Sequence, residues 1–334
     1  MVVRQFCDLN VQESTSYPQN LANIKQLISL GYTVVALNRH YGLPRKEHQK
    51  GKKNPNEKSS MDEAKKYVEE LRILHESLNK DIEKIRANQN TDQTGNEEDT
   101  VGHHTEKATV TNNDNELKVP EKFKLLSRVT FELDSIDQLS YLRSHSNKLI
   151  MEAFDLIAVY PKCEKCFRSL MEGKLDFDIV TFPMEDKLPF KLDRHQIGLG
   201  TSKGLTFEVN FSVAIKSQSL RKYVFMNSQS MVSKTKRAAG VIVNSGGESR
   251  MDFRAPPDVA NLCNLLFATN DGALGLHAIS STPRKMITRA LLRRQTFKGA
   301  VRVEKIVEEE EPESKEDGDL VVLHEEPAAK KRKI

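Results

Sequence analysis

The first forty residues alternate between apolar and polar positions in a way that predicts a strand, a helix and a second strand. Residues 6–11 alternate with a period of two, which is typical of a strand. Apolar residues within 20–30 recur at helical spacing, and Gly31 follows at a position where helices often end. Residues 33–38 form a short continuous apolar run, typical of a strand buried on both faces. Together the three elements predict a right-handed βαβ unit.

The same rhythm resumes at Lys124 and continues to about residue 294. Predicted strands lie at 125–133, 155–160, 179–182, 196–199 (the weakest), 205–211 and 239–244. Predicted helices start at Asp134 and after Pro161, and others cover 219–236, 258–267, 271–279 and 283–294. Seven or more strands alternating with helices favour an α/β fold with a closed, TIM-barrel-like parallel barrel. A doubly wound open sheet is the alternative, weakened by the lack of a glycine-rich dinucleotide fingerprint after an early strand.

Between these two parts, residues 46–119 are polar, and we interpret them as an insertion into the barrel. Residues 47–60 and 88–115 have almost no apolar side chains and are predicted to be disordered. Residues 62–86 carry apolar positions at near-heptad spacing and predict one amphipathic helix. That helix either packs on the barrel or forms a short coiled-coil contact with a partner. Because the insertion supplies no strand, we expect residues 1–45 and 120–303 to fold as a barrel without it.

Composition places the chain among soluble globular proteins. Its 334 residues allow one large domain or two ordinary ones, and 38% of them are hydrophobic and 29% charged. Four cysteines in so long a chain do not make a disulfide framework, so a reducing compartment is expected. We expect no transmembrane helix, because no apolar run approaches ~18 residues. The N-terminal residues enter a strand pattern directly, so no secretory signal is expected either.

Residues 304–334 differ in composition from the rest. Glu and Asp dominate 304–326, and such a segment cannot bury a core, so a disordered tail is predicted. A compact basic run follows, formed by Lys330, Lys331, Arg332 and Lys333. Runs of this type serve as nuclear localisation signals. The alternative is a generic solvated basic segment.

Asp8 and Asn10, at the end of the first predicted strand, are the first place to look for catalysis. Metal-dependent phosphoesterases of the polymerase-and-histidinol-phosphatase type carry a His-x-His pair in the corresponding strand, and the histidines here are scattered. Hydrogen bonding within a polar barrel mouth is therefore favoured, with a vestigial metal site as the alternative. Cys163 and Cys166 have metal or redox spacing but lack a second pair, which favours two small residues on one helix face. We predict no catalytic residue, metal ligand or cofactor.

Basic residues in the second half of the chain are the positive functional signal. The candidates for RNA contact are Lys216, Arg221, Lys222, Arg254, Arg284, Lys285, Arg289 and Arg293. Few acidic residues accompany them, and a basic face binds nucleic acid through phosphates without reading its sequence. Lys285, Arg289 and Arg293 are four residues apart and share one face of the last predicted helix. The alternative is a solvated helix face. Since the chain has no Trp and few aromatic residues, recognition of RNA shape and backbone is favoured over base stacking.

Several segments resemble, in order, the thirty-kilodalton protein subunit family of nuclear ribonuclease P and ribonuclease MRP. They are residues 6–9, 30–38, 155–162, 187–190, 203–216, 254–262 and 284–290. The clearest is 203–216, where a Gly-Leu-x-Phe-Glu strand leads into an Ala-Ile-Lys turn. Each segment is weak alone, but their shared order argues against a chance match.

The resemblance implies a barrel without its own active site, related to the polymerase-and-histidinol-phosphatase fold and attached to a catalytic RNA. The implied partners are ribonuclease P RNA, RNase MRP RNA, a smaller ribonuclease P protein subunit and the other subunits, with precursor tRNA reached through the particle. The implied work is 5′-leader removal from precursor tRNA, and rRNA processing, in the nucleus and nucleolus. The insertion at 46–119 departs from the short family members, which leaves its contacts open. The alternative function is a metal-dependent phosphoesterase on the same barrel.

Overall fold

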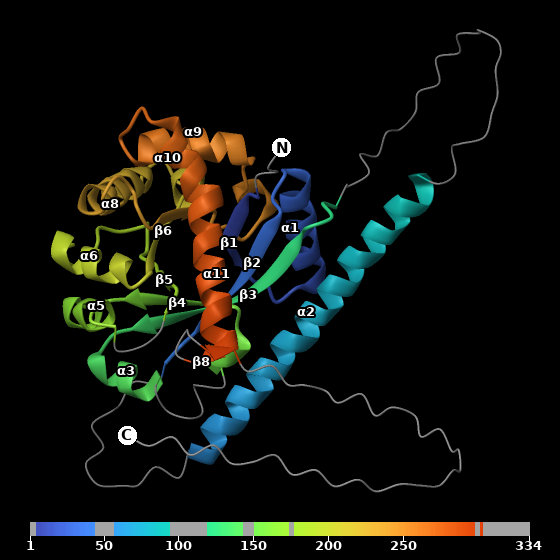
Figure 1. Cartoon of the computed structure of the whole chain (residues 1–334), viewed down its shortest axis with the longest axis horizontal. Coiled ribbons are helices and arrows are strands. Elements are labelled where there is room, and N and C mark those ends of the chain that lie inside the picture. Colours follow the sequence, from blue (N-terminus) through green and yellow to red (C-terminus); the bar gives the residue numbers. More distant parts are fainter. Residues whose placement is uncertain are drawn as a thin grey trace, which may run out of the picture.

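Seven parallel strands form one curved sheet in the computed structural model, which describes residues 5–43, 57–93, 119–142, 150–173, 177–297 and 301–302. The strands are β1 (Cys7–Gln12), β2 (Val34–Tyr41), β3 (Lys124–Leu133), β4 (Leu156–Pro161), β5 (Ile179–Val180), β6 (Thr206–Asn210) and β7 (Val241–Asn244), each paired with the next. The sheet is curled so that its two edges meet. This is shown by the Gln12 amide at the end of β1, which donates to the Gly247 carbonyl after β7 at 2.9 Å. The side chain of Asn244 also accepts from the Leu9 amide at 2.9 Å. This nearly closed barrel confirms the prediction and excludes the open sheet (Figure 1).

Helices follow most strands and cover the outside of the barrel. They are α1 (Tyr17–Ser29), α2 (Glu57–Gln93), α3 (Ile136–Leu142), α5 (Glu164–Met171), α6 (Arg194–Ser202), α7 (Ser212–Lys216), α8 (Arg221–Lys234), α9 (Pro256–Leu266), α10 (Gly272–Leu276) and α11 (Thr282–Gln295), with the short turns η1 (Arg250–Asp252) and η2 (His277–Ser281). A small antiparallel hairpin, β8 (Thr296–Phe297) and β9 (Val301–Arg302), follows α11. Among the described helices, none is long and apolar enough to cross a membrane.

The weakest predicted strand, residues 196–199, is wrong, because these residues lie within α6. The Asp193 carboxylate caps this helix by accepting from the Gln196 amide at 3.3 Å. Its buried positions are Ile197 and Gly200, a spacing of three that belongs to a helix and not to a strand. Four residues are too few to separate the two periods in the sequence alone.

The helix α2 is the crossover that covers the outer face of β2 and β3. Its Leu71 packs in the same apolar cluster as Phe131 of β3, and its Leu78 packs with Ile24 and Leu27 of α1. Packing on the barrel, the first of the two options for this segment, is therefore confirmed. Deleting the whole insertion would uncover this apolar surface, and the expectation that the barrel folds without it stays a prediction.

The helix α2 is also longer than predicted, since 57–60 and 88–93 are helical and not disordered. Extending an existing helix costs little because each added residue gains a hydrogen bond. At 1.5 Å per residue the helix is about 55 Å long, and both ends reach past the neighbouring barrel elements in Figure 1. Residues 46–56 and 94–118 of the insertion and the tail from residue 303 lie outside the described residues.

The helix α11 crosses the amino-terminal ends of the strands and closes that end of the barrel (Figure 1). Its Met286 and Ala290 are buried against an interior cluster that includes Cys7 and Val34 at the starts of β1 and β2. The interior of the barrel is therefore packed at its amino-terminal end, and its polar residues gather toward the other end.

Candidate functional site

A buried ion pair occupies the interior near the carboxyl ends of the strands, where barrel enzymes place their active sites. Arg128 of β3 and Glu208 of β6 are fully buried, and they meet in a two-pronged contact. The Nη1–Oε1 distance is 2.5 Å and the Nη2–Oε2 distance is 2.7 Å. Nη1 also donates to the Leu9 carbonyl at 2.8 Å. Such a pair is stable inside a protein only when further hydrogen bonds satisfy both ions.

Amide side chains from the neighbouring strands supply those further bonds. Asn244 donates to Glu208 Oε1 at 2.6 Å, and Asn10 donates to Oε2 at 3.2 Å. Asn38 donates to the Asn10 side-chain oxygen at 2.8 Å. We call Asn10, Asn38, Arg128, Thr130, Glu208 and Asn244 the mouth network, in which the Thr130 hydroxyl donates to Asn38 at 2.7 Å. Burial opposes ionisation of Glu208, but the charge and hydrogen bonds of Arg128 outweigh it, and the pKa of Glu208 is lowered.

Asp8 lies beside the mouth network and accepts hydrogen bonds there, as predicted for this residue. Its Oδ1 accepts from the Ser245 amide at 3.2 Å and from the Asn10 amide at 3.3 Å. Its Oδ2 is buried and has no hydrogen-bond partner among the described residues. Burial raises the pKa of Asp8, because the charged form is poorly solvated there.

The donors in the barrel mouth do not suit a metal ion. In the described part of the chain, no three His, Cys, Asp or Glu side chains are grouped so that they could hold one. Both Glu208 oxygens are engaged by the Arg128 guanidinium, which places a fixed positive charge against the only fully buried carboxylate of the mouth network. The geometry therefore gives no support to the phosphoesterase alternative.

The eight predicted RNA-binding residues do not form one patch. Lys216, Arg221 and Lys222 follow the carboxyl end of β6, where Lys216 pairs with Asp252 at 3.1 Å. The Arg221 Nε donates to the Ala214 carbonyl at 2.7 Å, and the Lys222 Nζ lies 4.9 Å from the centre of the Tyr223 ring. These residues are exposed at least in part, so their charges remain accessible. Arg254 donates to the carbonyls of Met251 and Phe253 at 2.8 and 2.7 Å.

The other four of these predicted residues belong to α11 at the opposite end of the barrel, and only Arg284 and Lys285 among them are exposed. Arg284 and Lys285 are exposed, with no side-chain hydrogen bond or ion pair to any described residue. Arg289 donates to the carbonyls of Phe177 and Gly204, both at 3.1 Å. Arg293 contacts both carboxylate oxygens of buried Asp178, at 3.2 and 2.8 Å.

The predicted shared exposed face of Lys285, Arg289 and Arg293 is therefore corrected, although RNA contact by these residues stays a prediction. Four-residue spacing shows that they share a side of the helix but not what covers that side. Gly204 illustrates how close α11 packs: its φ is +82°, and a Cβ there would lie 2.6 Å from Arg289 Nε.

The predicted nuclear localisation signal, formed by Lys330, Lys331, Arg332 and Lys333, lies outside the described residues.

Comparison with known proteins identifies the family of this chain. The model of the family described as RNase P subunit p30 matches residues 75–295, about two thirds of the chain. The chain belongs to the RNase P subunit p30 family. This match includes α2 from its middle, β3 to β7 and α11, so it covers most of the barrel.

Named relatives agree with the family. The "Ribonuclease P protein subunit p30" of Mus musculus is 31% identical over 174 residues, 52% of this chain and 63% of that one. The "Ribonuclease P/MRP protein subunit RPP1" of Saccharomyces cerevisiae is 28% identical over 148 residues, 44% of this chain and 48% of that one. A chain of the cryo-EM structure of archaeal ribonuclease P with mature tRNA is 16% identical and covers 91% of this chain and 100% of that one. Its TM-score of 0.52 shows a shared fold.

The Cys163–Cys166 pair of this p30-family chain has a structural explanation. The Cys163 sulfur caps α5 by accepting from the Cys166 amide at 3.2 Å. Burial raises the pKa of Cys166 to about 12, so its thiol is protonated at neutral pH. A protonated thiol is neither a good nucleophile nor a metal ligand. The expected arrangement of two small residues on one helix face holds only in part, because Cys166 lies inside α5 whereas Cys163 is the capping residue before it.

Sequence reasoning missed Arg128 and Glu208, the centre of the mouth network. A weak signal exists, because each is a charged residue inside a predicted strand and the two charges are opposite. Charged residues are almost never fully buried unless they are paired. What the sequence does not reveal is that β3 and β6 face each other across the barrel.

Proposed function

We propose that the chain is a protein subunit of the ribonuclease P particle, and of RNase MRP, that binds the catalytic RNA and supports 5′-leader removal from precursor tRNA. The observation that carries this proposal is the family match over most of the barrel. The names of the mouse and yeast relatives support the assignment to ribonuclease P, and the yeast name extends it to RNase MRP. Its partners are the two RNAs, a smaller ribonuclease P protein subunit and further subunits.

The geometry supports a subunit without catalytic groups of its own. Within the mouth network Arg128 and Glu208 neutralise each other where a barrel enzyme would bind its substrate, and only Arg128 Nε lacks a hydrogen-bond partner among the described residues, so we assign the chemistry to the RNA. Exposed cations that have no acidic partner among the described residues, such as Arg284 and Lys285, supply the attraction to phosphates.

The decisive experiment isolates the tagged full-length chain from cells and sequences the RNA that co-purifies. Ribonuclease P RNA and RNase MRP RNA should be enriched, and absence of both refutes the proposal. The test variant carries Arg284→Glu and Lys285→Glu, and it should bind less RNA with a salt slope reduced by about 0.7–0.9 per lost phosphate contact.

The matched control carries Lys165→Glu and Lys191→Glu, which change the net charge equally at exposed sites of α5 and of the loop before α6. Because these two lysines are outside the proposed RNA-binding set, RNA binding should change less in this control. Equal losses in the two variants would indicate a response to net charge and remove α11 from the RNA interface.

Nuclear and nucleolar localisation belongs to the same proposal, because precursor tRNA and rRNA are processed there. Replacing Lys330, Lys331, Arg332 and Lys333 with Ala should leave a fluorescently tagged, unassembled chain in the cytoplasm. Continued nuclear accumulation of the free variant would show that another segment directs import.

A further inference from the structure

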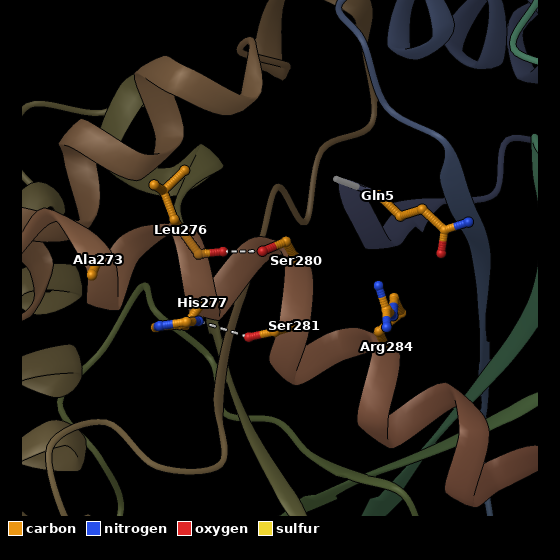
Figure 2. Close-up of a pocket in the computed structure, with 7 residues that line it drawn as sticks. All are labelled: Gln5, Ala273, Leu276, His277, Ser280, Ser281 and Arg284. Carbon is orange, nitrogen blue, oxygen red and sulfur yellow. Dashed lines mark hydrogen bonds between the residues drawn. The ribbon is translucent and has the colours of Figure 1, made fainter. Parts of the chain in front are cut away.

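A small cavity lies at the amino-terminal end of the barrel, between the residue that leads into β1 and the helices α10, η2 and α11. Its volume is about 180 Å³. Figure 2 shows Gln5 and Arg284 on one side, His277, Leu276 and Ala273 on the other, and two serines between them. The mouth network is at the other end of the barrel, so this cavity is separate from it.

The wall formed by η2 is held in a fixed shape. The five residues of η2 form a π-helical turn, a feature that is rare and often found at functional sites. The hydroxyl of Ser281 and Nδ1 of His277 are 2.9 Å apart, and the Ser280 hydroxyl donates to the Leu276 carbonyl. Gly275 allows α10 to approach α9 closely, since a Cβ there would lie 2.4 Å from the Ala260 carbonyl oxygen. The cavity is therefore preformed.

Arg284 gives the cavity its charge. The other arginines that follow it on α11 are engaged: Arg289 by backbone carbonyls, Arg293 by Asp178 and Arg294 by Asp155 at 2.8 Å. The Arg284 side chain has neither a hydrogen bond nor an ion pair within the described ranges, and Lys285 beside it is equally free of them. An anionic group is the complement of such a site.

The size and lining of the cavity limit which chemical groups can bind in it together with an anionic group. Its volume equals about six waters at ~30 Å³ each, and it is below the ~300 Å³ of common small-molecule pockets. Leu276 and Ala273 offer apolar contact, while the Gln5 amide and the His277 ring offer donors and acceptors. One planar heterocycle fits this combination, provided that the rest of its molecule lies along the surface.

We propose that this cavity takes one unstacked nucleotide of a single-stranded RNA, with its base against Leu276 and His277 and its phosphate on Arg284. Unstacked bases are the usual targets when proteins read RNA locally. Gln5 would meet the base edge, which adds one local base contact to an interface otherwise dominated by phosphates. The inference rests on the proposed function for the identity of the RNA, but it can be tested without that RNA.

The test places a benzophenone amino acid at Ala273 of the purified full-length chain and irradiates it with a labelled, mixed-sequence single-stranded RNA decamer. The decamer should crosslink at this position and be displaced by unlabelled single strand but much less by a duplex. Arg284→Ala should lower the crosslink yield about tenfold, the effect of losing one charge-assisted contact. Arg237→Ala is the control, because it removes an exposed cation that is paired with Asp271 and does not line the cavity.

A second control probe at exposed Met226 of α8 reports nonspecific crosslinking. Equal yields at Ala273 and Met226, equal competition by the duplex, or no effect of Arg284→Ala would each overturn the inference. In the isolated particle, a crosslink from Ala273 to protein in place of RNA would overturn it as well. Failure of catalytic RNA to co-purify is a separate result, which refutes the proposed function and leaves the decamer result intact.

Discussion

The buried pair in the barrel mouth should make Glu208→Gln one of the most destabilising conservative changes in this chain. Gln has nearly the shape of Glu, so the change removes charge without creating a cavity. It leaves the Arg128 guanidinium fully buried without a counter-ion, and two charge-assisted bonds of 2.5 and 2.7 Å are lost or weakened. Removing one member of a buried pair costs about 3–5 kcal/mol, against a total stability of about 5–15 kcal/mol.

The assay is thermal and urea unfolding followed by circular dichroism, because the chain contains no Trp. A loss of that size should lower the melting temperature by roughly 6–20 °C, at about 2–4 °C per kcal/mol. Glu132→Gln is the matched control, since Glu132 is 40% exposed and pairs with Lys162 at 2.6 Å. An exposed pair contributes at most about 1 kcal/mol. If the two variants lose equal stability, the buried pair does not hold the mouth together.

A double-mutant cycle and a pH series separate charge from packing. Arg128→Met combined with Glu208→Gln removes both charges, so it should be more stable than Glu208→Gln alone even though the Leu9 carbonyl loses its donor. The pKa of Glu208 is lower in the folded state, so its contribution exists above its unfolded pKa of about 4.3 and is lost as the pH falls through the folded value. The gap between wild type and Glu208→Gln should therefore shrink in acid.

Three further predictions follow from burial and charge. Because burial raises the pKa of Asp8, the folded state favours the protonated carboxyl and loses stability as the pH rises. Asp8→Asn should therefore raise the stability measured by urea unfolding at pH 7, and this gain should disappear in acid. Arg293→Ala should cost about 3–5 kcal/mol in the same assay, because it leaves buried Asp178 unpaired, whereas Lys285→Ala should leave the midpoint unchanged. Leu78→Ala should cost about 2–5 kcal/mol if α2 belongs to the core, whereas Ile73→Ala, at a position 56% exposed, should be nearly silent; equal effects would place α2 outside the cooperative unit.

The sequence was sufficient to predict the barrel because buried parallel strands leave a local trace. Runs such as 33–38 and 239–244 are apolar on both faces, so the seven strands of the barrel could be located in order, with one false strand at 196–199. The polar character of Asp8 and Asn10 at the end of β1 was also visible. The role of α2 was only half visible, because its apolar spacing predicts a helix but not the surface it covers.

Contacts between residues far apart in the chain could not be predicted. The pairing of Arg128 with Glu208 joins strands that are 80 residues apart, and no local pattern encodes it. The same limitation explains the error on α11. Its helical spacing predicted that Arg289 and Arg293 share a face, but not that the barrel covers this face. The pairing of Arg293 with Asp178 depends on the position of β5 beside α11, which is a contact between distant parts of the chain.

The position of α11 has a consequence for synthesis on the ribosome. All seven strands leave the exit tunnel before the helix that covers their amino-terminal ends, and proteins are made from the N-terminus at about 5–20 residues per second. Until Met286 and Ala290 emerge, the interior residues they cover, such as Cys7 and Val34, remain accessible to chaperones. A nascent chain that stalls before α11 would therefore expose the apolar lining of its barrel, and quality control could distinguish it from the finished protein by that surface alone.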